Sequence, residues 1–153
     1  MTGTRGNQQG VSLLEALISI LIFAIGILAI VALQAASIRT SSDAKYRADA
    51  SYLANQLVGR MWTDRANLAN YAHQANVTTA CDGRIGTTVA APTNASLNNW
   101  LQTVSTTLPG ATNGAQRVVV NTATNLVTIT MCWRAGSDTR ETRQFELSTQ
   151  ING

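Results

Sequence analysis

An apolar run near the N-terminus is the feature of this sequence that most restricts what the chain can fold into. From Ala16 to Leu33 the chain reads ALISILIFAIGILAIVAL, roughly 18 residues without a charge and with Ser19 as the one polar side chain. At ~1.5 Å per residue, a helix of this length crosses most of a ~30 Å hydrocarbon core. The sequence from Gln34 onward is rich in Ser, Thr, Asn and Ala. The pattern predicts a single N-terminal membrane span that carries a soluble domain.

A cleaved secretory signal is the alternative interpretation of the same run. Such a signal has a charged start, an apolar stretch of ~7–15 residues and a small-x-small cleavage site. Here the run is longer, Glu15 lies at its N-terminal end, and ALQAAS after it matches such a cleavage site only imperfectly. An uncleaved anchor is therefore favoured. Charge does not decide its orientation, because Arg5 precedes the span while Arg39, Lys45 and Arg47 follow it closely.

Glu15 places a carboxylate at the start of this apolar segment, where an unpaired charge is costly. A carboxylate at bilayer depth costs a few kcal/mol unless a partner offsets the loss of water, so an acid at this depth indicates function. The alternative is a glutamate that marks the interfacial end of a helix and lies among lipid headgroups.

The N-terminal sequence resembles that of type IV pilins and pseudopilins. The resemblance is carried by Gly10, by Glu15 at the fifth position after it, and by the long apolar helix that follows. The stretches SLLEALIS, GILAIVALQ and YLANQLVGRMWTDR look most like the PilV type of minor pilin, and the likeness covers residues 1–65. Two positions depart from the family pattern. Val11 stands where most pilins have phenylalanine, and Ala32 stands where many major pilins have proline.

This resemblance implies a processed, membrane-anchored assembly protein. The prepilin peptidase, on the cytoplasmic side, would cut between Gly10 and Val11, and the new N-terminus is the group that such pilins methylate. In a growing filament the Val11 ammonium of one subunit would pair with Glu15 of its neighbour, each charge offsetting the desolvation of the other. The implied partners are other minor pilins, the major pilin, the prepilin peptidase and the inner membrane. The globular part would lie in the periplasm and reach the cell surface with the pilus.

The helix is predicted to continue beyond the membrane to about Tyr71, because no proline occurs before Pro92. In its second half, apolar residues recur at helical spacing along one stripe. The residues of this stripe are Ala50, Leu53, Leu57, Met61, Leu68 and Tyr71. Trp62 is expected to be a core anchor, with a contact between subunits as the alternative.

The predicted fold class is α+β, with the long N-terminal helix packed on a small antiparallel sheet as in type IV pilins. His73 to Asn98 is polar and is interpreted as a loop. Ser96 is expected to cap a short helix with an apolar face that ends at Pro109 and Gly110. The runs QRVVVNT, LVTITMCWR and TRQFELST predict an antiparallel meander. The middle strand is expected to turn one strongly apolar face to the long helix, because apolar and other side chains alternate along it, the apolar ones being Val127, Ile129, Met131 and Trp133. The expected divisions are the leader 1–10, the transmembrane half-helix 11–33, the soluble half-helix 34–71 and the globular periplasmic domain 72–153.

Cys81 and Cys132 are the only cysteines. If the globular part is periplasmic, the oxidising compartment favours a disulfide between them. Such a bond would close a loop of about 50 residues and stabilise the domain by ~4 kcal/mol on the chain-entropy model. The alternative is two free thiols buried as small hydrophobic groups.

The sequence shows no constellation that points to catalysis, a metal or a cofactor. His73 is the only histidine, and a lone histidine just past a helix is expected in solvent. No cluster has metal-ligand spacing, and no glycine-rich phosphate loop follows a strand, so a non-enzymatic role is expected. A net charge of +3 invites a nucleic-acid interpretation. Electrostatic capture needs a contiguous basic patch, so no nucleic-acid partner is expected here. The basic residues around the sheet are Arg117, Arg134, Arg140 and Arg143, and the acids that partly offset them are Asp138, Glu141 and Glu146.

Together with the resemblance, these observations predict a minor pilin that joins other minor pilins in a complex that primes pilus assembly at the filament tip. A type II secretion pseudopilin is the nearest alternative, since the same N-terminus would serve it. A membrane-anchored adhesin or DNA-capture module is the alternative from another class.

Overall fold

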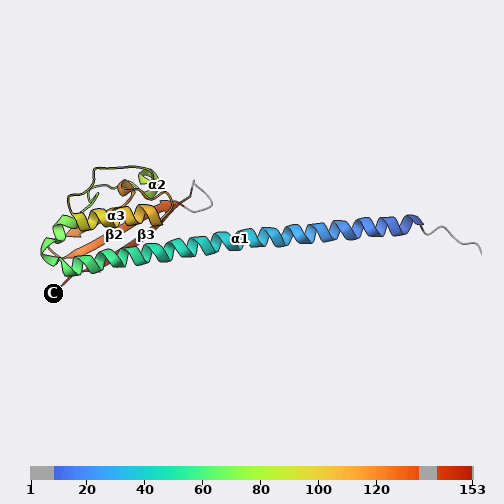
Figure 1. The fold of residues 1–153 in the computed structure, drawn as a ribbon, viewed down its shortest axis with the longest axis horizontal. Helices are drawn as coiled ribbons and strands as arrows, with labels where there is room; N and C mark the ends of the chain where they lie inside the picture. The colour runs from blue at the N-terminus through green and yellow to red at the C-terminus, as the bar shows by residue number, and fades with distance from the viewer. Residues whose placement is uncertain (1–8, 135–140, 153) are drawn as a thin grey trace, which may run out of the picture. The chain divides into compact units, whose positions relative to one another are not determined.

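The computed structural model describes residues 9–134 and 141–152 of the 153-residue chain. The chain divides into two compact units, Met1–Thr40 and Ser41–Gly153, and the first helix runs through both. The long apolar helix and the antiparallel sheet confirm the predicted α+β fold class. The elements (Figure 1) are the α-helices α1 (Gln9–Thr63), α2 (Cys81–Arg84) and α3 (Ala95–Thr107), the 3-10 helices η1 (Arg65–Tyr71) and η2 (Asn113–Ala115), and the strands β1 (Arg117–Asn121), β2 (Leu126–Arg134) and β3 (Thr142–Gln150).

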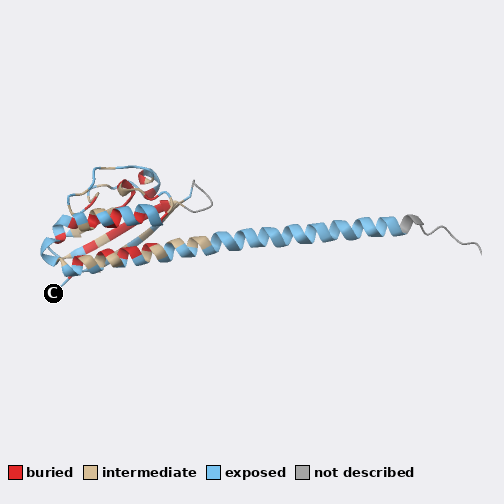
Figure 2. Ribbon diagram, in the orientation of Figure 1, coloured by how far each residue is buried: buried red, intermediate tan, exposed pale blue. Residues whose placement is uncertain are grey.

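In the first unit, residues 12–40 of α1 are exposed, apolar side chains included (Figure 2). Among the large apolar side chains from Leu13 to Leu33, the exposed fraction runs from 46% at Ile27 to 72% at Leu33. Among the described residues, α1 is the one helix long and apolar enough to cross a membrane by length and composition. An apolar surface this extensive calls for lipid or other apolar helices around it.

The second unit has a hydrophobic core between the C-terminal part of α1, η1, α3 and one face of the sheet. The predicted stripe is buried throughout, from Ala50 to Met61 in α1 and at Leu68 and Tyr71 in η1. The core residues of α3 and β2 are Leu97, Trp100, Leu101, Val104, Val127, Ile129, Met131 and Trp133. The apolar faces predicted for the short helix and for the middle strand are therefore confirmed.

The long helix ends earlier than predicted. α1 stops at Thr63, and the next turn is η1, which is kinked at Asn67 with φ −114° and ψ 22°. The Asp64 carboxylate accepts hydrogen bonds from Asn67 Nδ2 at 2.7 Å and from Tyr71 Oη at 3.2 Å. Short polar side chains that bond locally compete with helix continuation in this way. A continuous helix to Tyr71 is thus wrong, although the apolar positions of the last turns are buried as predicted.

The sheet is an antiparallel meander in the order β1-β2-β3, which confirms the predicted topology. Val118 pairs with Ile129, and Met131 pairs with Phe145. On the opposite face of β2, Thr130 and Cys132 are also buried. Cys132 there belongs to a second, small cluster whose other members are Cys81, Ala115 and the half-buried Ile85. The sheet is therefore covered on both faces at this end of β2.

The segment predicted as a loop holds more structure than expected. It includes α2 and the start of α3, and the cap of α3 is Asn94 rather than Ser96, since Asn94 Oδ1 accepts a hydrogen bond from Leu97 N at 3.0 Å. His73, expected in solvent, is 7% exposed. Its backbone pairs with Val118, and its Nε2 donates to the carbonyl oxygen of Asn113 at 2.7 Å. Those two partners explain why a lone histidine is buried here.

Candidate functional site

The residues predicted to act in processing and assembly lie at the start of α1. The leader residues 1–8 lie outside the described residues, whereas the backbone of Gly10 and Val11 is helical. Glu15 has an exposed side chain, and the described part of the chain offers it no ion-pair partner. Because the expected partner belongs to another subunit, this pairing stays a prediction. The shallow hollow beside Glu15, of about 330 Å³, is lined by Leu14, Ile18 and Ser19.

Two aromatic side chains of α1 are exposed in the second unit. Trp62 is 42% exposed, so its predicted role as a core anchor is wrong. It follows Met61, a member of the buried stripe, and one residue on a helix turns the side chain by about 100°, away from the core. Tyr52 is 69% exposed. The tryptophan that links α1 to α3 is instead Trp100, whose Nε1 donates to the carbonyl oxygen of Leu53 at 2.8 Å.

Cys81 and Cys132 form a disulfide bond that joins α2 to β2, with their Cα atoms 5.5 Å apart. The Arg84 guanidinium lies against this bond, and its Nη2 donates to Cys132 Sγ at 3.0 Å. Gln116, which is fully buried, hydrogen-bonds to the backbone N–H and C=O of Cys132. The bond therefore lies in a set of buried polar contacts between α2, β2 and the residue before β1.

The basic residues around the sheet are largely engaged within the fold. Arg143 forms ion pairs with Asp43 of α1 at 3.0 Å and with Glu141 at 2.6 Å. The pKa of Arg143 is raised, mainly by its hydrogen bond to Asp43 and to a smaller extent by its hydrogen bond to Glu141. Arg117 donates to the carbonyl oxygen of Ala75 at 3.1 Å. Arg140 and Asp138 lie outside the described residues. These contacts fix strands and loops and leave less charge for capturing a polyanion.

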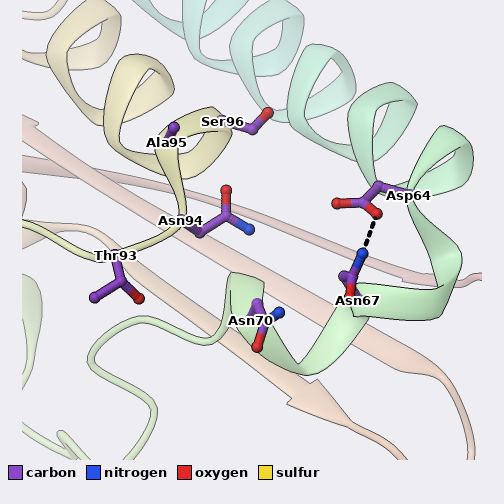
Figure 3. A pocket seen from close by; sticks show the side chains of 7 residues that line it. All are labelled: Asp64, Asn67, Asn70, Thr93, Asn94, Ala95 and Ser96. Carbon is purple, nitrogen blue, oxygen red and sulfur yellow. Dashed lines mark hydrogen bonds between the residues drawn. The ribbon is translucent and has the colours of Figure 1, made fainter.

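A polar hollow of about 430 Å³ lies between the end of α1, η1 and the start of α3 (Figure 3). Asp64 and Asn94 line it, and both use their side-chain oxygens inside the fold, Asp64 in the turn into η1 and Asn94 in the cap of α3. In the part of the chain that the structure describes, no group of three or more His, Cys, Asp or Glu side chains is placed to hold a metal ion. The remaining lining residues are Asn67, Asn70, Thr93, Ala95 and Ser96.

Residues 5–31 match the family model described as the prokaryotic N-terminal methylation motif. No curated protein and no solved structure matches the chain. The motif is a signal of the type IV pilin family and supports a type IV pilin or pseudopilin. It points to a structural protein that acts in pilus or pseudopilus assembly, rather than to an enzyme. Together with the apolar helix, it is consistent with an inner membrane anchor and a periplasmic globular domain. It also implies interaction with other pilins and with the prepilin peptidase.

The sequence did not predict the burial of three polar residues, Arg84, Gln116 and His73. Arg84 follows Cys81 by three residues, which places both side chains on one face as soon as a helical turn forms there, so this spacing was a usable signal. Gln116 and His73 carry no comparable signal. Their partners are backbone atoms of Cys132 and Asn113, and such partners are known only once the chain is folded.

Proposed function

We propose that the chain is a minor pilin of the PilV type, which joins other minor pilins in a complex that primes type IV pilus assembly and lies at the tip of the filament. The observation that carries the proposal is the first unit of α1. An apolar helix with exposed side chains has one carboxylate, Glu15, near its N-terminal end, and Glu15 and most of the apolar run lie within the methylation motif. A helix with these properties is suited to move from lipid into a bundle of like helices.

The mechanism we propose is helix packing guided by one charge pair. Cleavage after Gly10 creates an ammonium group on Val11, which is costly to bury alone. When a subunit enters the helix bundle, this ammonium and the Glu15 carboxylate of the neighbouring subunit offset each other's loss of water. Because only one axial position brings the two groups together, the pair also fixes the register of the subunits.

A type II secretion pseudopilin remains the second candidate, because the same methylation motif supports both. Co-purification separates the two proposals. Recovery of the full chain with other minor pilins supports the first, and recovery with secretion components supports the second. Recovery of a ligand alone, with neither set of subunits, would instead favour a membrane-anchored adhesin or DNA-capture module.

Substitution of Glu15 tests the proposed charge pair. The Glu15→Ala protein should still insert and be cut after Gly10, but it should associate poorly with other minor pilins and restore little piliation to a strain that lacks the wild-type protein. The reason is that an ammonium left alone in a dry bundle costs ~3–5 kcal/mol. Arg47→Ala, which changes an exposed residue of α1, is the control and should matter less. Normal piliation and association with Glu15→Ala would refute the pairing.

Processing is tested at the predicted cleavage site. Replacing Gly10 by leucine should leave the full-length precursor in the membrane, because a bulky side chain hinders the close approach of a peptidase to the backbone. Mass spectrometry of the wild-type protein should find a mature chain that starts at Val11. A mature chain with another first residue would show that this assignment is wrong.

A further inference from the structure

A second, smaller hollow lies on the face of the sheet that carries Thr130 and Cys132, away from the main core. Its volume is about 170 Å³, well above the ~30 Å³ that a water molecule takes up in the liquid. α2, the segment before it and all three strands contribute to its lining. The lining side chains that bear on its chemistry are Arg84, Arg117, Thr130, Gln144 and Glu146.

Both arginines keep donors without an acceptor. Arg84 is 5% exposed, and its Nε and Nη1 atoms are buried with no hydrogen-bond partner among the described residues. The Nε of Arg117 is likewise buried, with no hydrogen-bond partner among the described residues. Buried donors are almost always paired, and an unpaired donor on a charged group is the most unfavourable case. These atoms therefore call for an acceptor that the described chain does not provide.

The guanidinium of Arg84 is held in place by the disulfide. Its Nη2 donates to Cys132 Sγ at 3.0 Å and to Cys81 Sγ at 3.6 Å. The plane of the guanidinium is thus set by α2 and β2 together, and less freedom is lost when a ligand binds. Burial, and then the nearby Arg117 guanidinium, lower the pKa of Arg84. An anion between the two arginines would offset the cost of burying the Arg84 charge and would reduce the repulsion between the two guanidinium groups.

The charge of the lining favours a monovalent anion. Two guanidinium groups face one carboxylate, that of Glu146, whose Oε2 accepts a hydrogen bond from Thr130 Oγ1 at 3.3 Å. Within the described residues, no ion pair joins Glu146 to either arginine. The lining therefore carries one net positive charge. A carboxylate matches this charge and the planar donors of arginine better than a doubly charged phosphate does.

We propose that this hollow is a binding site for a carboxylate group, held by Arg84 and Arg117. The carboxylate belongs either to a small free organic acid or to an acidic side chain that another protein inserts. A volume of about 170 Å³ is sufficient for a carboxylate with a short stem. This proposal does not depend on the pilin function proposed above.

The test uses the full chain, labelled with ¹⁵N, in dodecyl maltoside micelles. Sodium acetate should shift the Nε–Hε NMR signals of Arg84 and Arg117 in a saturable way, and sodium chloride at the same ionic strength should not. A short peptide with blocked ends and one glutamate identifies the source. Binding of acetate alone assigns a free acid, and binding of the peptide alone assigns a protein side chain. No shift with either, or an equal shift with chloride, would overturn the proposal.

Single substitutions test whether acetate binds through the residues that line the hollow or only through the net charge of the protein. Arg117→Gln should weaken acetate binding by about tenfold or more, because it removes a charge-assisted donor. Glu146→Gln should tighten binding several-fold, because it removes the opposing charge. Glu141→Gln is the matched control, since it removes the same charge just before β3 but does not line the hollow. If Glu141→Gln tightened binding as much as Glu146→Gln, the proposal would be wrong. The Glu146 variant changes an exposed side chain and is expected to fold.

Discussion

The buried amide of Gln116 should contribute strongly to the stability of the domain. Its Nε2 donates to the carbonyl oxygen of Cys132 at 3.0 Å, and the backbone N–H of Cys132 donates to its Oε1 at 3.1 Å. β1 pairs with β2 up to Arg117 and Thr130, and the backbone groups of Cys132 point to the same side as those of Thr130. The Gln116 side chain thus supplies to Cys132 the two hydrogen bonds that a further paired residue of β1 would otherwise supply.

Gln116→Leu keeps a similar volume and removes both bonds to Cys132, together with the bond that Gln116 Nε2 donates to the carbonyl oxygen of Thr112 at 3.1 Å. It leaves the N–H and the C=O of Cys132 buried without partners, at ~1–3 kcal/mol each, so the expected loss in unfolding free energy is about 2–6 kcal/mol. Stabilities of domains are about 5–15 kcal/mol, so this is a large share. With a urea slope of about 2 kcal/mol per M, the unfolding midpoint should fall by about 1–3 M.

The assay is urea unfolding of the full chain in micelles, followed by tryptophan fluorescence, which reports on the buried Trp100 and Trp133. Gln102→Leu, at an exposed position of α3, is the control and should change the unfolding free energy by less than about 0.5 kcal/mol. A loss below about 1 kcal/mol for Gln116→Leu would refute the reasoning, since the Cys132 groups would then have found other partners.

Three further changes can be measured by the same unfolding assay. Asn94→Ala should lower the unfolding free energy by about 1 kcal/mol, because it removes the cap of α3; no loss would contradict the cap. Trp100→Phe should lower it by about 2 kcal/mol through the lost hydrogen bond to Leu53 and the smaller ring, and a neutral result would show that α1 and α3 are not held together there. Cys132→Ser should lower it by ~4 kcal/mol by opening the loop to Cys81, and reduced wild-type protein should be about as weak as this variant; an oxidised wild type no more stable than the variant would contradict the bond.

Much of the fold could be predicted from the regular spacing of apolar residues. The features that depend on local polar contacts could not be predicted in this way. The alternation of Val127 and Ile129 with polar neighbours predicted which face of the middle strand is buried, because burial in a sheet follows a period of two. The end of α1 at Thr63 was missed, because it depends on which neighbours hydrogen-bond to the Asp64 side chain rather than on hydrophobic spacing. The burial of His73 was missed for a similar reason, since its partner Asn113 is distant in sequence.

The candidate site divides in the same way. Gly10, Val11 and Glu15 form a short, contiguous pattern that can be recognised without a structure, and the match to the methylation motif includes all three. The hollow with Arg84 and Arg117 is lined by segments that are far apart in the sequence, so no local sequence pattern predicts it.

Because burial changes along α1, related sequences should show different kinds of substitution in its first part and in its last turns. The large apolar side chains from Leu13 to Leu33 are all exposed in the single chain, so exchanges among Leu, Ile, Val and Met keep the surface apolar and should be frequent. Ala50 and Ala54 are fully buried, and a larger side chain there would have to displace the packed core. One continuous helix is thus under two kinds of selection, for hydropathy in its first part and for side-chain size in its last turns.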